Sequence, residues 1–404
     1  MKKPEILAPA GDLEKLMYAV AYGADAVYLG GLDFGLRVQA ASFDQAAMEE
    51  GLNYAHKHGV KVYITLNVFA RNRDFEFLPN YIRMLARIGI DGVIVADPGV
   101  LALVSELAPN LNVHISTQAN TTNWRSAIFW QNLGAKRIVL ARELSLEEIR
   151  AIHSKTDIEL EIFIHGAMCV SYSGRCLLSS YFTGRNANQG DCAQPCRWKY
   201  NLVEEKRPGE YLPVYEDEQG TYILSSRDLC LLEYLPELVR AGVTSFKIEG
   251  RVKSVHYVAT ITSVYRQAID AYWANPDNYQ LKDVWLEEIG KVSNREYTNG
   301  FICGERPGES PPALAIYNRS YTFVGVVLGY DAKQGRLIIE QRNRFKQGEV
   351  LEALTPGHEL LSIQVNELYA EDGLSIEAAP HPQQHVYLTW PSALPERTLL
   401  RRAE

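Results

Sequence analysis

Four cysteines between residues 169 and 196 are the side chains of this sequence with the most specific chemistry. Cys169 and Cys176 lie in IHGAMCVSYSGRC, and Cys192 and Cys196 lie in GDCAQPCRW, which gives the spacing C-x6-C-x15-C-x3-C. Zinc sites typically pair their cysteines in C-x2-C knuckles, and this pattern contains none. An iron-sulfur cluster needs no such knuckle, because each thiolate binds a different iron of the cluster. The spacing therefore favours a metal centre held by these four thiols.

Two other interpretations of the cysteines remain open on the residues alone. A free cysteine is commonly a small buried apolar residue, although Gly190 and Pro195 indicate a loop around the second pair. Alternatively, Cys169 or Cys176 is a nucleophile paired with His165. The sequence identifies no third residue that would orient such a pair.

The remaining two cysteines are expected to be structural. Cys230, in RDLCLLEYLPEL, stands at the start of a predicted apolar helix and is expected to be buried, and Cys303 lies in GFICGE. Six cysteines in 404 residues are too few for a disulfide scaffold. In a reducing compartment, cysteines clustered at short spacing more often bind metal or act in catalysis.

Polar residues stand where a series of apolar runs ends. In KIEGR, Lys247, Glu249 and Arg251 occupy alternate positions, which places them on one side of a predicted strand end. Such a set can hold a small carboxylate-bearing molecule through bidentate arginine contacts. For any single position, a loop cap or an ion pair with a neighbour is the alternative. The other candidates are Asn67, Asp97, Ser116, Gln118, Asn120, Arg142 and His165 at strand ends, and Arg37 in a loop after the second run.

Eight short apolar runs, alternating with helix-like segments, must position these candidates. Continuous Val, Ile and Leu runs are typical of strands buried on both faces of a parallel sheet. Eight strand-helix units favour closure into a (β/α)8 TIM-like barrel over an open doubly wound sheet. Asp12 is expected to cap the first helix, and Ser145 with Glu148 forms a capping box. The runs are residues 5–11, 26–31, 61–68, 92–98, 112–118, 136–142, 159–166 and 245–251.

A long insertion, residues 167–244, separates the seventh run from the eighth and begins with the cysteines. Insertions after barrel strands lie at the C-terminal face, where such barrels build their sites. After the eighth run, RVKSVHYVATITSVYRQAIDAYWANP predicts a long amphipathic helix. We expect the barrel domain over residues 1–304, a proline-rich linker over 305–315 and a small antiparallel β-barrel over 316–404.

Charge and missing motifs exclude several function classes. The net charge of -8 argues against a surface that binds phosphate backbones throughout, but a local basic groove is compatible with it. In QRNRFKQGE, Arg342, Arg344 and Lys346 are either phosphate contacts or charges that protect an edge strand. No run of about 18 apolar residues occurs, so we expect a cytoplasmic protein without membrane association. The motifs H-E-x-x-H, G-x-S-x-G and G-x4-G-K-[ST] are absent from the sequence.

The sequence resembles the collagenase-like proteins known as unassigned-peptidase family 32. The segment EIFIHGAMCVSYSGRCLLSS matches that family's signature, and APAGDLEKL, GADAVYLGG, FKIEGRVKS and YTNGF are similar to its recurrent blocks. Within the family, GDCAQPCRWKY and EDEQGTYILSSRDL most resemble the members that hydroxylate tRNA. The resemblance extends over the whole chain, including the small C-terminal domain.

The resemblance implies an iron-sulfur enzyme that forms 5-hydroxyuridine at the wobble position of tRNA and depends on prephenate. It implies a 4Fe-4S cluster on Cys169, Cys176, Cys192 and Cys196, with Cys230 as a reserve fourth ligand. The anticodon loop would meet the small domain and a basic rim, and its unpaired bases would splay into the mouth of the barrel. The rim residues are Arg185, Arg197 and Lys199.

The remaining candidates divide into two groups under this interpretation, and other functions stay open. The catalytic candidates are His165, Glu249, Arg251 and Asp97, and the substrate-binding candidates are Arg37, Asn67, Gln118, Arg142 and Lys247.

The older family name instead predicts a collagenase-like peptidase. Hydroxylation of another RNA base or of a small aromatic precursor is a further alternative, as is a cluster-holding scaffold that works beside a partner subunit or as a homo-oligomer.

Overall fold

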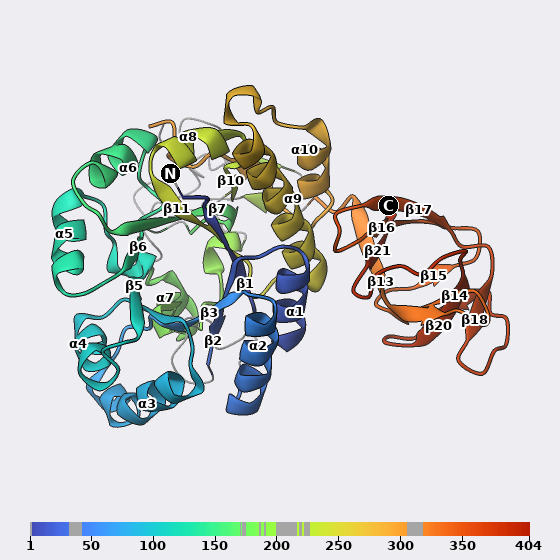
Figure 1. Ribbon diagram of the computed structural model, residues 1–404, viewed down its shortest axis with the longest axis horizontal. Helices are drawn as coiled ribbons and strands as arrows, with labels where there is room; N and C mark the ends of the chain where they lie inside the picture. The colour runs from blue at the N-terminus through green and yellow to red at the C-terminus, as the bar shows by residue number, and fades with distance from the viewer. Residues whose placement is uncertain are drawn as a thin grey trace, which may run out of the picture.

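The protein consists of a helix-covered barrel and a smaller β domain packed beside it (Figure 1). The structure is a computed structural model that describes residues 2–31, 43–169, 171, 175–185, 187–189, 191–198, 216–217, 220–221, 227–304 and 318–404. The predicted linker, residues 305–315, lies outside the described residues, so the predicted domain limits stay a prediction.

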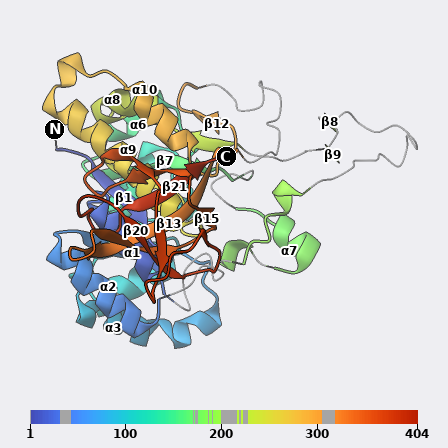
Figure 2. The same cartoon turned by 90° about the vertical axis from the view of Figure 1, so that its right-hand side faces the viewer.

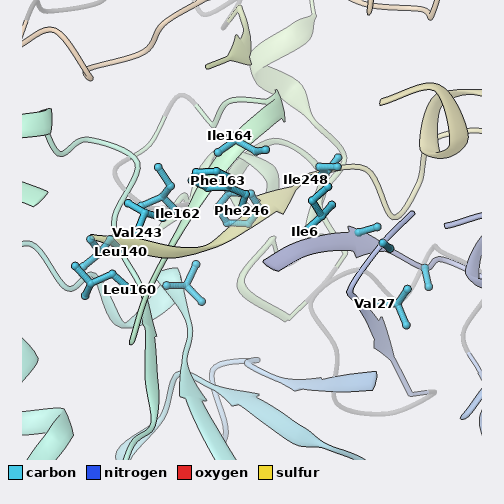
Figure 3. Packing of buried hydrophobic residues seen from close by; sticks show 14 of the residues in the cluster. Ile6, Val27, Leu140, Leu160, Ile162, Phe163, Ile164, Val243, Phe246 and Ile248 are labelled. Carbon is cyan, nitrogen blue, oxygen red and sulfur yellow. The ribbon is translucent and has the colours of Figure 1, made fainter. Parts of the chain in front are cut away.

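Eight parallel strands form the closed barrel that the apolar runs predicted. Each strand pairs with the next along the chain, and β11 closes the ring by pairing with both β7 and β1. The strands are β1 (Glu5–Pro9), β2 (Ala26–Gly30), β3 (Lys61–Leu66), β4 (Gly92–Val95), β5 (Asn112–Ile115), β6 (Arg137–Val139), β7 (Glu159–Ala167) and β11 (Val243–Ile248). Their outer faces carry the main apolar core, as the side chains of β7 and β11 illustrate (Figure 3).

The helices begin where the predicted caps stand. The side chain of Asp12 accepts a hydrogen bond from the N–H of Lys15, and Ser145 with Glu148 forms the predicted capping box. The barrel helices are α1 (Leu13–Ala21), α2 (Gln45–Lys57), α3 (Leu78–Ile88), α4 (Pro98–Leu107), α5 (Trp124–Asn132), α6 (Leu146–His153), α8 (Leu235–Arg240), α9 (Val255–Ala274) and α10 (Asp283–Gly290), and α7 (Leu178–Thr183) lies in the insertion. No helix of the described chain has the length and apolar character needed to cross a bilayer.

The predicted long helix is present as α9, but it is buried around most of its circumference, so its polar face is narrower than an amphipathic pattern implies. One side packs on the barrel core through residues such as Val258 and Ile261. The opposite side, including Val255 and Ala259, packs with Val326 of the second domain. A polar face was unnecessary because the second domain covers the side that would otherwise meet water.

Two strands beside the end of β7, one from the insertion and one from the chain after α10, were not anticipated from the sequence. β10 (Asp228–Cys230) pairs antiparallel with the end of β7, and β12 (Tyr297–Thr298) pairs with β10. Cys230 therefore lies on a strand opposite His165, and its predicted place at a helix start was wrong. The nine-residue β7 is long enough to offer β10 a free edge beyond the barrel. Two short strands, β8 (Glu216–Asp217) and β9 (Gly220–Thr221), also pair with each other.

The second domain is an antiparallel sheet around its own apolar core. Seven strands follow the order β17-β16-β21-β13-β14-β20-β18. The end strands β17 and β18 do not pair with each other, so backbone hydrogen bonds do not close the sheet into the predicted barrel. The strands are β13 (Tyr321–Asp331), β14 (Arg336–Gln341), β16 (Val350–Leu354), β17 (Leu360–Gln364), β18 (Leu368–Ala370), β20 (His385–Thr389) and β21 (Leu399–Ala403), with β15 (Phe345–Lys346) and β19 (Ala378–Ala379) forming a separate pair.

Ion pairs join the second domain to the barrel. Arg342 directly follows the central strand β14 and pairs with Glu14 of α1, so this cation is already engaged within the protein. Arg401 is fully buried and pairs with Glu288 of α10 at 2.6 Å. Arg344 and Lys346 are exposed, and their role as phosphate contacts stays a prediction.

Candidate active site at the mouth of the barrel

An ionic layer crosses the interior of the barrel beneath the mouth. Glu161 of β7 is fully buried and lies 2.8 Å from Lys247 Nζ and 3.2 Å from Arg137 Nη1. Arg137 also donates to Glu5 at 2.6 Å. Burial by itself raises the pKa of the Glu161 carboxyl, but Lys247 and Arg137 outweigh burial and hold the pKa at about 2. The carboxylate is therefore charged and keeps Lys247 fixed below the mouth.

The alternate positions of KIEGR do share one side, as predicted. Lys247 Nζ lies 4.5 Å from the centre of the Tyr28 ring, and the Arg251 guanidinium lies 5.9 Å from the centre of the same ring. Arg251 Nη1 also donates to Thr65 Oγ1 at 3.2 Å. Cations over an aromatic face are held by the ring's electrostatic quadrupole. Tyr28 thus contacts both Lys247 of the buried ionic layer and Arg251 at the mouth.

Arg142 and Glu249 form the adjacent part of the mouth. Arg142 Nη2 lies 3.7 Å from Glu249 Oε2, and the guanidinium stacks 3.8 Å from the centre of the Phe163 ring. The backbone of Glu249 is fixed as well, since its N–H donates to His165 O and its carbonyl accepts from Tyr257 Oη. The carboxylate therefore stands at a defined position beside Arg142.

Gly166, at the end of β7, allows this close packing. Its φ is +109°, and a Cβ added there would lie 2.5 Å from the carbonyl oxygen of Glu249. Gly166→Ala is therefore expected to combine backbone strain of about 1–3 kcal/mol with displacement of Glu249. Thermal unfolding and activity should both fall.

Gly184→Ala is the matched control for Gly166. Gly184 also has a positive φ, +70°, but an added Cβ would meet nothing within 4 Å. This variant should show the strain without the displacement of Glu249. Equal losses of activity in the two variants would contradict a special role for the contact between Gly166 and Glu249.

The opposite wall of the mouth is built from uncharged amides. Asn67 Nδ2 donates to Ser116 Oγ at 3.1 Å, and the N–H of Gln118 donates to the same oxygen at 3.2 Å. The side-chain oxygens of Asn67, Gln118 and Asn120 are buried and have no hydrogen-bond partner among the residues that the structure describes. A buried acceptor left unpaired costs about 1–3 kcal/mol. These amides are therefore ready to accept donors from a bound neutral molecule.

The cysteine-bearing insertion is anchored on this amide wall. Arg175, between Cys169 and Cys176, donates from Nη2 to the carbonyl of Gln118 at 3.0 Å. The carbonyl of Asn188 accepts from the N–H of Phe69, which follows β3. These bonds place the thiols and the mouth residues in one region, as expected for an insertion after a barrel strand.

Two of the predicted ligand cysteines act electrostatically on a third, Cys169. Burial raises the pKa of the Cys169 thiol, and the neighbouring Cys176 and Cys192 raise it further. Cys192 Sγ also accepts the N–H of Gln194 at 3.3 Å, the kind of hydrogen bond that tunes cluster thiolates. Among the electrostatic neighbours of Cys230 are Tyr265 and Glu233, which places it in a different environment.

The thiol arrangement suits a cluster better than a single ion. Within the described ranges, no three histidine, cysteine or acidic side chains converge closely enough to hold one metal ion. A zinc ion would draw its thiolates to about 2.3 Å from one centre, whereas a four-iron cluster binds each thiolate through a different iron. The set of Cys169, Cys176 and Cys192 near one another, with Cys196 in the short turn Pro195–Arg197, is compatible with the second case.

Several predicted site residues lie apart from this arrangement. The buried ring of His165 is surrounded by Tyr257, Tyr265 and Tyr297, and burial lowers its pKa to about 3. Asp97 caps α4 by accepting from the N–H groups of Gly99 and Val100. The catalytic roles of both stay predictions. Exposed Cys303 bonds to Tyr234, and Cys230 is largely buried. Arg185 pairs with Asp191, while Arg37, Lys199 and the side chain of Arg197 lie outside the described residues.

The structure adds four residues that the sequence analysis did not select. They are Arg137 and Glu161 of the ionic layer, Phe163 beneath Arg142, and Arg175 on the amide wall. The alternation of Glu159 and Glu161 within the apolar run ELEIFIHG was a usable signal, because charges at alternate positions of a barrel strand point to one face. Nothing local distinguished Arg175 from any other loop arginine.

Comparison with known proteins gives matches over nearly the whole chain. The model of peptidase family U32 matches residues 11–311, and the model of the peptidase family U32 C-terminal domain matches residues 319–401. A tRNA hydroxylation protein of Bacillus subtilis is 44% identical over 95% of this chain and 91% of its own length. A tRNA hydroxylation protein of Escherichia coli is 37% identical over 98% and 95%, respectively. A 23S rRNA 5-hydroxycytidine synthase of Escherichia coli is 35% identical over 97% of this chain and 57% of its own length.

Proposed function

This chain belongs to peptidase family U32, and on that premise we propose that it hydroxylates tRNA, forming 5-hydroxyuridine at the wobble position. The observation that carries the proposal is the docking of the cysteine-bearing insertion on the mouth of the barrel through Arg175 and Gln118. The near-full-length similarity to two tRNA hydroxylation proteins supports the choice of RNA. The cysteines that would carry the oxidation chemistry would thereby lie next to the residues that bind the substrate at the mouth of the barrel.

The thiols of Cys169, Cys176, Cys192 and Cys196 would hold a 4Fe-4S cluster. Such a cluster supplies one-electron transfer chemistry when bound. The fit rests on the electrostatic influence of Cys176 and Cys192 on Cys169 and on the N–H donated to Cys192. Arg142 partly offsets the burial that raises the pKa of the Cys169 thiol.

The two walls of the mouth suit two different ligands. Arg142 and Arg251 form a cationic wall above the buried Lys247, and this wall would bind the carboxylates of prephenate as a co-substrate. Asn67 and Gln118 form a neutral wall whose unpaired oxygens match the N3–H donor of a uracil base, while their amide groups can donate to its carbonyls. Glu249 Oε2, 3.7 Å from Arg142, is the group we assign to accept a proton between the two walls.

A peptidase function is less well supported by the same residues. A nucleophilic cysteine requires a lowered thiol pKa, yet burial raises the pKa of Cys169, one of the two candidate nucleophiles. His165, the proposed partner of a nucleophile, has a pKa lowered to about 3 and is enclosed by tyrosines. This arrangement favours an uncharged, shielded imidazole over a general base that meets a substrate.

Deletion of the gene in a strain without a second copy tests the proposed reaction. Mass spectrometry of tRNA nucleosides is expected to show loss of 5-hydroxyuridine and recovery when the wild-type gene is returned. Unchanged 5-hydroxyuridine in the deletion strain would contradict the proposal. Loss of 5-hydroxycytidine from ribosomal RNA instead would assign the same chemistry to a different base.

A further inference from the structure

Large apolar side chains project into solvent from the insertion beside the cysteines. Leu177 is 74% exposed and Tyr181 is 82% exposed, and Trp198 is 45% exposed after the turn that holds Cys196. The rings of Tyr181 and Phe182 contact each other edge to face, with centres 5.3 Å apart. Figure 2 shows α7 standing outside the ring of barrel helices.

The helix α7 exposes apolar side chains and buries a polar one, the opposite of an ordinary surface helix. Such helices bury their apolar residues and expose their polar ones, but the residue that α7 buries is Ser179. Ser179 Oγ accepts the N–H of Ala193, which ties α7 to the loop between Cys192 and Cys196. The aromatic residues are thereby held outward by a polar contact on the inner side.

The charge of this segment indicates what the aromatic face binds. Residues 169–200 contain four basic residues, Arg175, Arg185, Arg197 and Lys199, and one acidic residue, Asp191, so their formal sum is 4 − 1 = +3 in a chain of net charge -8. A segment that combines aromatic rings with a net positive charge suits single-stranded nucleic acid, since rings stack on bases and cations meet phosphates. A purely apolar partner would gain nothing from the concentrated positive charge.

We propose that Tyr181, with Leu177, Phe182 and Trp198, forms a stacking platform for unpaired RNA bases next to the modified nucleotide. The inference rests on the proposed RNA hydroxylation and adds the surface that binds the flanking bases. The platform is covalently close to the thiols, because α7 begins two residues after Cys176 and Trp198 follows Cys196 by two residues. Bases stacked there would lie beside the mouth, where a splayed uridine enters.

The test compares RNA binding by full-length variants of the platform. Tyr181→Ala and Trp198→Ala are each expected to weaken binding of an anticodon stem-loop with a wobble uridine by about 5- to 100-fold, the effect of losing one base-aromatic stack. Tyr181→Phe keeps the ring and is expected to bind like wild type. Binding of a fully paired RNA duplex of equal length should change less than twofold, because its bases are already stacked.

Phe129→Ala supplies the matched control, since Phe129 is 54% exposed on α5, an outer barrel helix. It should leave RNA binding unchanged, and iron content with thermal unfolding checks that each variant is folded. Wild-type affinity in Tyr181→Ala and Trp198→Ala would overturn the platform. So would a wild-type dimer that these variants convert to monomer with unaltered RNA affinity.

The proposed platform and the proposed reaction can be contradicted independently of each other. Nucleoside analysis in the deletion strain decides whether the protein hydroxylates tRNA, and the binding comparison decides whether α7 contacts the RNA. A protein that hydroxylates tRNA normally when Tyr181 and Trp198 are both alanine, with unchanged affinity, overturns the platform and leaves the reaction in place.

Discussion

Cys176→Ala is expected to abolish iron binding and hydroxylation. Loss of an outer-shell partner typically costs 10- to 100-fold in metal affinity or activity, so loss of a ligand should cost more than about 100-fold. Cys176 is buried within the insertion, and its carbonyl accepts from Asn188 Nδ2, which fixes its backbone. Anaerobic purification followed by iron and sulfide analysis measures the first effect, and tRNA nucleoside analysis measures the second.

The two cysteines outside the predicted set serve as matched controls. Cys303→Ala should keep full iron content, because Cys303 is exposed and bonds to Tyr234. Cys230→Ala should also keep its iron, since the thiol of Cys230 on β10 lies 3.9 Å from Tyr265 Oη on α9. Iron loss in Cys230→Ala together with retention in Cys196→Ala would reassign the fourth ligand. Absence of iron from the anaerobically purified wild type would contradict the cluster.

Glu161→Gln is expected to reduce the free energy of unfolding by about 3–5 kcal/mol at neutral pH, the usual cost of breaking a buried ion pair by removing one partner. The change leaves Lys247 buried without the carboxylate 2.8 Å away. Activity should fall as well, because Lys247 would no longer be held under Tyr28. Urea unfolding of the purified proteins measures the stability difference.

The pH dependence of this difference follows from the lowered pKa of Glu161. Its carboxyl titrates at about 2 in the folded protein against an ordinary value of 4.5. The stabilisation is therefore complete above pH 4.5 and is lost as the pH falls from 4.5 towards 2, with a size of roughly 3 kcal/mol. The difference in unfolding free energy between wild type and Glu161→Gln should shrink over this range.

Glu371→Gln is the control for Glu161, because Glu371 is exposed. Its stability should stay within about 0.5 kcal/mol of wild type at every pH. A constant difference between wild type and Glu161→Gln down to pH 3 would show that the carboxylate is not held charged by Lys247 and Arg137.

The order of the barrel strands and the place of the cysteines could be predicted from local patterns. A strand buried on both faces must be a continuous apolar run, so the eight runs mark the barrel strands whatever lies around them. The ends of those runs locate the mouth, which is why Asn67, Gln118, Arg142, Glu249 and Arg251 were found together. The insertion after the seventh run placed the thiols at the same face.

Partnerships across the fold were not encoded in any local pattern. The sequence alone predicted that Lys247 binds substrate, but only closure of the barrel brings Glu161 within 2.8 Å of it. Arg342 gave the same local signal as Arg344, yet domain packing pairs it with Glu14.

The sequence by itself thus determined the elements, the side of the barrel that carries the chemistry and the four thiols, because burial periodicity and chain connectivity are local properties. Only the tertiary structure decided which charges neutralise each other, that α9 is buried on both sides and that α7 turns its rings outward. Those outcomes depend on which distant surfaces meet. The local sequence around a charge or an aromatic ring does not indicate whether its partner is water, a carboxylate or a base.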